Sequence, residues 1–212
     1  MIKNKSIQLV YQSVYCTLAF LAILSSVGAF DYSFKSDFYI YYTNLSNYFC
    51  FFVMFMELLQ TMKKRKNSYV TFNPLLKFVG VICILLTGLV FNCVLYSTCS
   101  KEFNSNIFNI MFHKILPVMF VLDYILFYKR RGSKWYFPVV AIVSSFLYVA
   151  FIFLRAFILG FNTKYLLYPY FFLDINTIGV AGVLKWLLYL SVPFVVIVYF
   201  VYFMDKIFKS KS

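Results

Sequence analysis

Long apolar stretches alternate with short polar segments along the whole chain. A helix that crosses the hydrocarbon core of a bilayer needs ~20 predominantly apolar residues. Six stretches approach that length. The pattern predicts an all-α integral membrane protein, in which residues 1–212 form a single domain built as a bundle of six transmembrane helices. The predicted spans lie near residues 7–29, 38–61, 75–97, 108–128, 136–159 and 182–203.

The second predicted span carries a polar stripe on an otherwise apolar helix. At about 100° per residue, the stripe falls within roughly 80° of one helix face. Amide and carboxylate side chains are costly against lipid, so this face should meet other helices or a wet cavity. Its members are Thr43, Asn47, Cys50, Met54, Glu57 and Thr61, with Ser46 at the edge. The opposite face, which includes Phe52 and Val53, is predicted to meet lipid.

The first predicted span follows basic residues, as the apolar core of a signal peptide does. Its apolar run is longer than the ~7–15 residues of such a core, so we expect a retained helix. Gln8 and Gln12 lie one turn apart on it and should face protein.

Composition and charge support a membrane protein and indicate its orientation. Hydrophobic residues make up 63% of the chain and charged residues 13%, which a soluble domain could not bury. The net charge of +13 comes from basic residues in short runs between the apolar spans. Thirteen of them lie in the N-terminus, two candidate inner loops and the tail, and only Lys35, Lys101 and Lys164 lie in outer loops. This asymmetry predicts a multi-pass protein of the cell membrane with both termini in the cytoplasm and no nucleic-acid partner.

The cysteines show neither a disulfide framework nor a zinc-ligand spacing. Five are present, and four of them fall inside apolar spans, namely Cys16, Cys50, Cys83 and Cys93. A free cysteine behaves mostly as a small apolar residue. We therefore predict structural thiols, no metal site and no cofactor.

Four unusual polar residues fall at one depth on four different predicted helices: Thr43, His113, Arg155 and Lys185. At a rise of 1.5 Å per residue, each lies roughly 5 to 8 Å inside its helix end. Side chains at one depth can converge on one site. Pro117 has no N–H, so the carbonyl of His113 loses its usual helical partner and a kink is expected there. A structural role stays open for each, because Thr bonds carbonyls of its own helix and Arg or Lys extends toward the interface.

Three stretches together resemble the bacterial six-helix membrane proteins called the Pr6Pr family. They are YYTNLSNYF at 41–49, HKILPVMFVLDYILF at 113–127, and YPYFFLD at 168–174 followed by Gly179. More distantly, the arrangement is similar to the androgen-induced membrane hydrolases of animals, which cleave fatty acid esters of hydroxy fatty acids with an intramembrane Thr and His. The resemblance implies that Thr43 and His113 occupy these two positions.

One function that follows is hydrolysis of a lipid ester. Thr43 would be the nucleophile and His113 its general base, which requires hydrogen-bond contact between them. Asn47, one turn from Thr43, could donate a hydrogen bond to an oxyanion. Asp174 is the only acidic residue that we expect as a partner of His113. The residues predicted to bind the lipid or acidic acyl substrate are Asn47, Ser46, Arg155, Lys185 and Asp174, with the two cations holding a carboxylate.

The alternative is a non-enzymatic transporter, lipid-binding protein or assembly protein that uses the same polar cavity. Transport would favour polar groups that continue along the second span from Thr43 to Glu57. Glu57 and Asp123 lie toward the cytoplasmic side, where they either pair with loop cations or take part in proton coupling.

Overall fold

The fold is a bundle of long helices. The computed structural model describes residues 4–63, 71–128, 132–160 and 165–208. Within these residues there is no strand, and six helical segments are long and apolar enough to cross a membrane, which confirms the predicted all-α bundle of six long apolar helices. These segments are Lys5–Ser26, Tyr42–Lys63, Pro74–Leu95, Ile107–Leu126, Tyr136–Leu159 and Ile175–Ile207.

Two of the six segments contain a π-helical turn. The third consists of α3 (Pro74–Val90) and a π-helical turn η1 (Phe91–Leu95), and the fourth of α5 (Ile107–Ile110), a π-helical turn η2 (Met111–Ile115) and α6 (Leu116–Leu126). The others are α1 (Lys5–Ser26), α2 (Tyr42–Lys63), α7 (Tyr136–Leu159) and α8 (Ile175–Ile207), and α8 is kinked at Gly179, whose backbone is not helical. The short elements α4 (Lys101–Ser105) and η3 (Phe171–Leu173) lie in connections.

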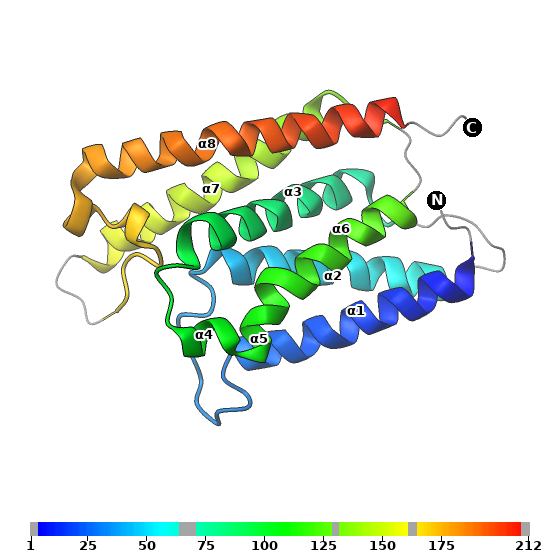
Figure 1. The fold of residues 1–212 in the computed structure, drawn as a ribbon, viewed down its shortest axis with the longest axis horizontal. Helices are drawn as coiled ribbons and strands as arrows, with labels where there is room; N and C mark the ends of the chain where they lie inside the picture. Colours follow the sequence, from blue (N-terminus) through cyan, green and yellow to red (C-terminus); the bar gives the residue numbers. More distant parts are fainter. Residues whose placement is uncertain (1–3, 64–70, 129–131, 161–164, 209–212) are drawn as a thin grey trace.

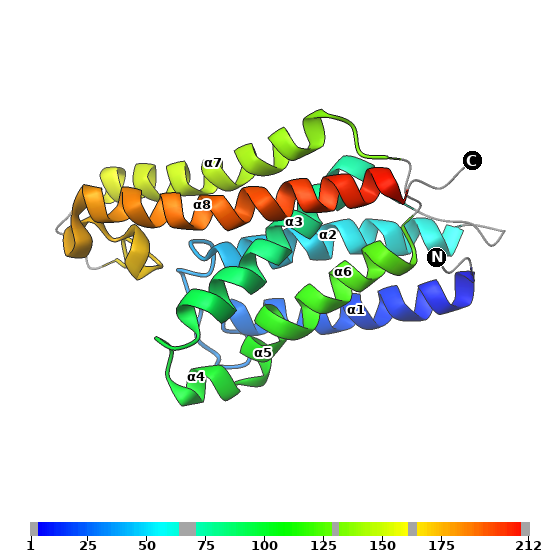
Figure 2. The ribbon, with the colours of Figure 1, turned by 45° about the horizontal axis from the view of Figure 1, so that its top comes forward.

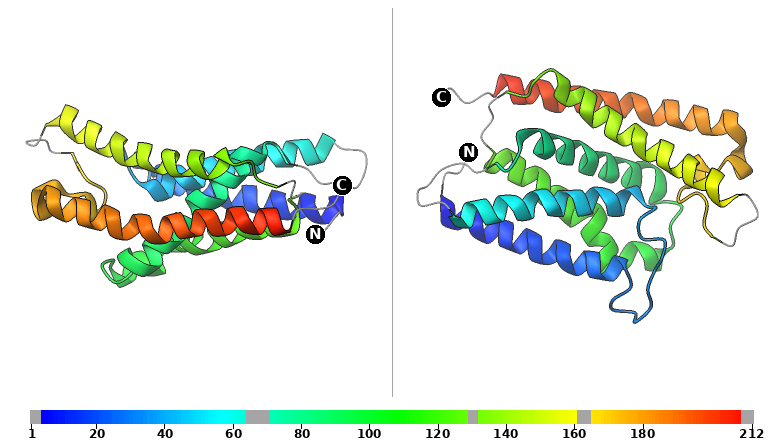
Figure 3. Two further views of the ribbon diagram at one scale, coloured as in Figure 1. Left: turned by 90° about the horizontal axis from the view of Figure 1, so that it is seen from above. Right: turned by 180° about the vertical axis from the view of Figure 1, so that it is seen from behind.

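Helix α3 lies at the centre of the bundle (Figure 1). It packs against α2 and α6 on one side and against α7 and α8 on the other. Helix α1 covers α2 and α6, and α7 and α8 run side by side (Figure 3). Helix α3 is therefore surrounded by other helices. Half of the residues in the most apolar stretch of Pro74–Leu95 are buried.

The two ends of the bundle differ. One end carries the loop between α1 and α2, together with α4, α5 and the segment 165–174 (Figure 2). We call it the loop end. The start of α1 and the end of α8 lie at the opposite end, which we call the terminal end (Figure 1). Many of the basic residues that predicted the orientation lie outside the described residues: Lys3, Lys64, Arg65, Lys66, Lys129, Arg130, Arg131, Lys164, Lys209 and Lys211.

Element α8 opens with a short helical turn at Ile175, and the backbone then kinks at Gly179 (φ 69°, ψ 168°), so the uninterrupted helix begins close to the predicted residue 182. Asp174 starts the short turn, because its carboxylate accepts hydrogen bonds from the N–H of Asn176 at 2.9 Å and from the hydroxyl of Thr177 at 2.6 Å. A side chain that satisfies free N–H groups in this way starts a helix. Part of the predicted loop over 160–181 is therefore helical.

The polar stripe of α2 is buried as predicted, from Thr43 to Thr61. Val53 was predicted to meet lipid and is fully buried, so that part of the prediction is wrong. The buried arc is wider than the polar stripe because α2 packs against both α1 and α3. Phe52 is exposed. Gln8 and Gln12 face protein, as expected.

Candidate functional site

The site forms where α2 meets the π-helical turn η2. The Oγ1 atom of Thr43 lies 3.3 Å from Nε2 of His113, and both side chains are buried. The other ring nitrogen, Nδ1, lies 2.9 Å from the carbonyl oxygen of Asn109. The structure thus brings together the two residues that the sequence predicted to meet.

The contacts of His113 determine where its proton lies. A carbonyl oxygen can only accept a hydrogen bond, so Nδ1 carries the proton and donates to Asn109. In a neutral imidazole, Nε2 then has a free lone pair and accepts from the hydroxyl of Thr43. This is the protonation pattern of a general base that faces a nucleophile. A main-chain carbonyl takes the place that an acid was expected to fill.

The kink predicted from Pro117 takes the form of the π-helical turn η2, in which the N–H of Leu116 bonds to the carbonyl of Met111. This turn carries His113 toward α2. A second π-helical turn, η1, faces it, and its Phe91 ring stacks on the imidazole with 3.7 Å between ring centroids. The sequence analysis missed η1 and Phe91, because no residue of FNCVL marks a π-helical turn. π-Helical turns are often found at functional sites.

Asn47 and Ser46 hold Thr43 in place and do not point to a substrate. The amide nitrogen of Asn47 donates to the carbonyl of Thr43 at 2.8 Å and to that of Phe112 at 3.1 Å. Both of its N–H groups are therefore in use, which leaves none for the oxyanion role predicted for Asn47. Ser46 contacts the carbonyl of Thr43 at 3.0 Å and the hydroxyl of Thr87 at 2.7 Å, so it ties α2 to α3.

Two cavities meet at Thr43. The larger has a volume of about 790 Å³, opens among the loop-end segments, and includes His113 and polar side chains such as Asn44 and Asn109. The smaller has a volume of about 100 Å³ and is mostly apolar, with Leu86, Val149 and Leu187 in its wall. Thr43 lines both cavities, as do Phe91, Leu95 and Tyr170.

Tyr170 reaches the site from the segment 165–174. It lies beside Thr43 in the walls of both cavities. Burial raises the pKa of Tyr170, and polar interactions with Thr43, Tyr42 and Tyr148 oppose the rise. The phenol therefore keeps its proton beside Thr43 and remains able to donate a hydrogen bond.

The remaining predicted site residues lie elsewhere. Arg155 donates to the hydroxyl of Tyr39 at 3.1 Å and to the carbonyl of Leu166 at 2.8 Å, so it holds the segment 165–174. Lys185 is exposed on α8 and lies over the ring of Tyr189. Neither lines the cavities, because each points to a partner near the surface. Asp174 caps the N-terminus of α8 and is not the hydrogen-bond partner of His113.

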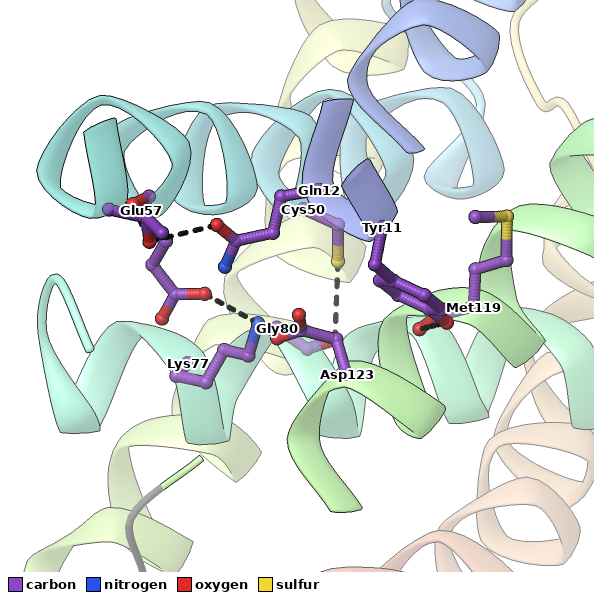
Figure 4. A network of polar contacts seen from close by, with 9 residues as sticks. Tyr11, Gln12, Cys50, Glu57, Lys77, Gly80, Met119 and Asp123 are labelled. Atoms are coloured by element: carbon purple, nitrogen blue, oxygen red, sulfur yellow. Dashed lines mark hydrogen bonds and ion pairs between the residues drawn. The ribbon is translucent and has the colours of Figure 1, made fainter. Parts of the chain in front are cut away.

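A second polar cluster lies toward the terminal end (Figure 4). The ammonium of Lys77 is 2.8 Å from Glu57 Oε2 and 2.6 Å from Asp123 Oδ2, and all three side chains are buried. We call these residues the charge triad. Glu57 and Asp123 were predicted either to pair with loop cations or to take part in proton coupling, and the cation that they pair with is a lysine inside α3. The sequence analysis missed Lys77 because it lies close to the start of its span, where a lysine normally extends to the interface.

Among the described residues, no group of three His, Cys, Asp or Glu side chains could hold a metal ion. Comparison of the chain with family models, with curated proteins and with solved structures finds no match. The resemblance to the Pr6Pr family therefore stays a prediction, and the geometry around Thr43 carries the functional interpretation.

Proposed function

We propose that this chain is an intramembrane hydrolase of lipid esters, with Thr43 as nucleophile and His113 as general base. The observation that carries the proposal is the buried contact of 3.3 Å between Thr43 Oγ1 and His113 Nε2. A base in a productive complex lies at about 2.6 to 3.2 Å, and such contacts are often longer without substrate. The orientation of the ring by Asn109 leaves the correct nitrogen free.

The reaction has two halves. Thr43 Oγ1 attacks the ester carbonyl carbon while His113 Nε2 takes the hydroxyl proton, and His113 then returns this proton to the departing alkoxide. An acyl group is now bound to Thr43. Water attacks the acyl group in the second half, with His113 again accepting and returning a proton. The products are a carboxylic acid and an alcohol, and Thr43 is restored.

Tyr170 is the candidate donor to the oxyanion that forms during each attack. Tyr170 lines both cavities together with Thr43 and its phenol interacts with Thr43, so it lies near the carbon that Thr43 would attack. A fixed O–H donor in a buried site is worth more to the transition state than one in water. Asn47, whose amide hydrogens are engaged, instead fixes Thr43 relative to η2.

The two cavities suit an amphiphilic ester. The small apolar cavity between α3, α7 and α8 is lined by side chains that match an acyl chain. The larger cavity holds polar groups such as Lys35, Asp37 and Glu102 that match the polar part of a lipid. Because Thr43 lines both, the ester bond would lie at their junction. We also infer that the loop end faces out of the cell and both termini lie in the cytoplasm, since the described lysines Lys5, Lys63, Lys134 and Lys206 lie at the terminal end of the bundle.

A transporter is less well supported than a hydrolase. Between Asn47 and Glu57 the stripe of α2 offers only Cys50 and Met54, and Cys50 donates to the carbonyl of Gly80 at 3.4 Å. Met54, Ile82 and Phe120, which are fully buried, fill this level of the bundle. A lipid-binding protein that does not cleave its ligand would use the same cavities, and an activity measurement separates the two.

Hydrolysis of a long-chain fluorogenic acyl ester by the purified protein tests the proposal. We expect turnover by the parent protein and its loss in Thr43→Ala. Thr61→Ala is the matched control, because Thr61 is a buried threonine of the same helix that bonds Gln12 at 3.0 Å far from the cavities. Turnover that is equal in Thr43→Ala and Thr61→Ala would contradict a nucleophilic role, and binding of the ester without turnover would favour the lipid-binding alternative.

A further inference from the structure

The charge triad has an unbalanced charge. Two carboxylates and one ammonium sum to −1 when all three are ionised. The side chains of Lys77, Glu57 and Asp123 are at most 2% exposed, and all three lie in segments long and apolar enough to cross a membrane. An uncompensated charge in such surroundings costs several kcal/mol.

The contacts around the triad leave its carboxylates incompletely bonded. Glu57 and Asp123 each give one oxygen to Lys77. The main chain of Phe72 approaches the Glu57 carboxylate. The second oxygens, Glu57 Oε1 and Asp123 Oδ1, nevertheless have no hydrogen-bond partner among the described residues, and neither does the buried amide nitrogen of Gln12. Buried polar atoms are nearly always paired, and a carboxylate oxygen accepts, so the two unpaired oxygens can take an additional positive partner, whereas the Gln12 amide nitrogen is itself a donor.

A proton fits this place better than a metal cation. The Lys77 ammonium already occupies the position between the carboxylates (Figure 4). It also lies 4.2 Å from the centre of the Phe120 ring. A metal ion would lie beside that ammonium and be repelled by it. A proton on a carboxylate oxygen needs no new space and brings the charge of the triad to zero.

The other titratable groups near the triad do not supply the missing charge. Tyr11, Tyr15 and Cys16 approach from α1, and all three interact electrostatically with Asp123. Cys50 of α2 interacts electrostatically with Lys77. Phenols and thiols are neutral in their ordinary forms near pH 7 and lose protons to become negative, so none of them can balance the carboxylates.

We propose that the charge triad is a proton-binding site, in which Glu57 and Asp123 together hold one proton at neutral pH. The site is separate from Thr43 and does not depend on the chemistry proposed there. When the proton is bound, α2, α3 and α6 are joined by a neutral cluster. When it is lost, the same helices enclose a net negative charge.

Infrared spectroscopy of the purified protein tests this site, because a protonated carboxyl group has its own C=O band that shifts in D₂O. The protein is kept at neutral pH in an alkyl maltoside, a detergent without a carbonyl group. We expect the parent to show a protonated carboxyl band. Labelling the aspartates or the glutamate residues with ¹³C at the carboxyl should shift this band in the parent protein, so that its assignment needs no substitution.

The variants Glu57→Gln and Asp123→Asn sharpen the test. Each leaves one carboxylate paired with Lys77, so each is expected to fold and each alone should remove the triad's entire contribution to the band. Asp205→Asn is the matched control, since Asp205 is a buried carboxylate with one unpartnered oxygen that bonds Ser133 instead of a lysine. Absence of the band from the parent, or its survival in both triad variants, would overturn the proposal.

Discussion

Thr43 of α2 and His113 of η2 lie 70 residues apart in the sequence, yet their side chains meet at 3.3 Å in the buried part of the bundle. The contact depends on a π-helical turn that carries the imidazole toward α2 and on an asparagine that ties the two elements together. A buried hydroxyl and a neutral imidazole in this arrangement can act as a nucleophile and its base.

Removal of the imidazole should abolish most of the proposed activity. We expect His113→Ala to lower the rate of ester hydrolysis by about 10² to 10⁴, the usual contribution of a general base. Thr61→Ala is again the control, because Thr61 is buried on α2 and lines neither cavity. Similar losses in the two variants would mean that the site responds to packing and not to the base.

Loss of the Tyr170 hydroxyl should slow the reaction without unfolding the protein. We expect Tyr170→Phe to lower kcat by about 10² to 10³, with a smaller change in KM, because the donor acts on the oxyanion. Tyr168→Phe removes a hydroxyl from the same segment at a side chain that lines neither cavity, and should leave kcat unchanged. An unchanged kcat in Tyr170→Phe would remove Tyr170 from the mechanism.

Pro117 should matter through the shape of η2. An alanine at this position restores an N–H that can bond the carbonyl of His113 and return the turn to regular α-helix. The imidazole would then rotate away from Thr43. We expect Pro117→Ala to lose activity while its melting temperature is unchanged or higher, and full activity in a stable variant would show that η2 does not depend on the proline.

Gly80 allows α3 to approach α2 and α6 closely. A Cβ atom there would lie 3.0 Å from the Phe120 ring and 3.5 Å from the Cys50 sulfur. We expect Gly80→Ala to destabilise the protein by about 1 to 3 kcal/mol, the usual cost of overpacking a core. A Cβ at Gly88 of the same helix meets nothing within 4 Å, so Gly88→Ala should have little effect. Thermal unfolding in detergent measures both, and equal melting temperatures would disprove the close packing.

Periodicity predicted the part of the site that lies on a regular helix. Thr43 and Glu57 lie on one face of α2 because a helix repeats every 3.6 residues, and that face is buried. The prediction that Val53 meets lipid was wrong because the spacing of residues along a helix identifies its polar face. It does not show how many neighbouring helices pack against it. Arg155 was expected at the cavity from its depth alone, but its guanidinium turns to the segment 165–174.

Other parts of the site depend on contacts that spacing does not reveal. Tyr170 reaches Thr43 only because the segment 165–174 folds over the bundle, and no periodic signal marks that path. Phe91 meets His113 because two π-helical turns face each other. Lys77 is buried because two carboxylates from other helices accept its charge, a combination visible only once the helices are packed.

Trapping of an acyl group on Thr43 tests the central claim most directly. The purified protein is mixed with a p-nitrophenyl ester of a long-chain fatty acid, quenched in acid within one turnover and digested for mass spectrometry. We predict that the peptide containing Thr43 gains the mass of the acyl group, that Thr43→Ser also forms the adduct, and that Thr43→Ala does not. Hydrolysis by Thr43→Ala at the parent rate, or an acyl group on another residue that persists in this variant, would contradict the account.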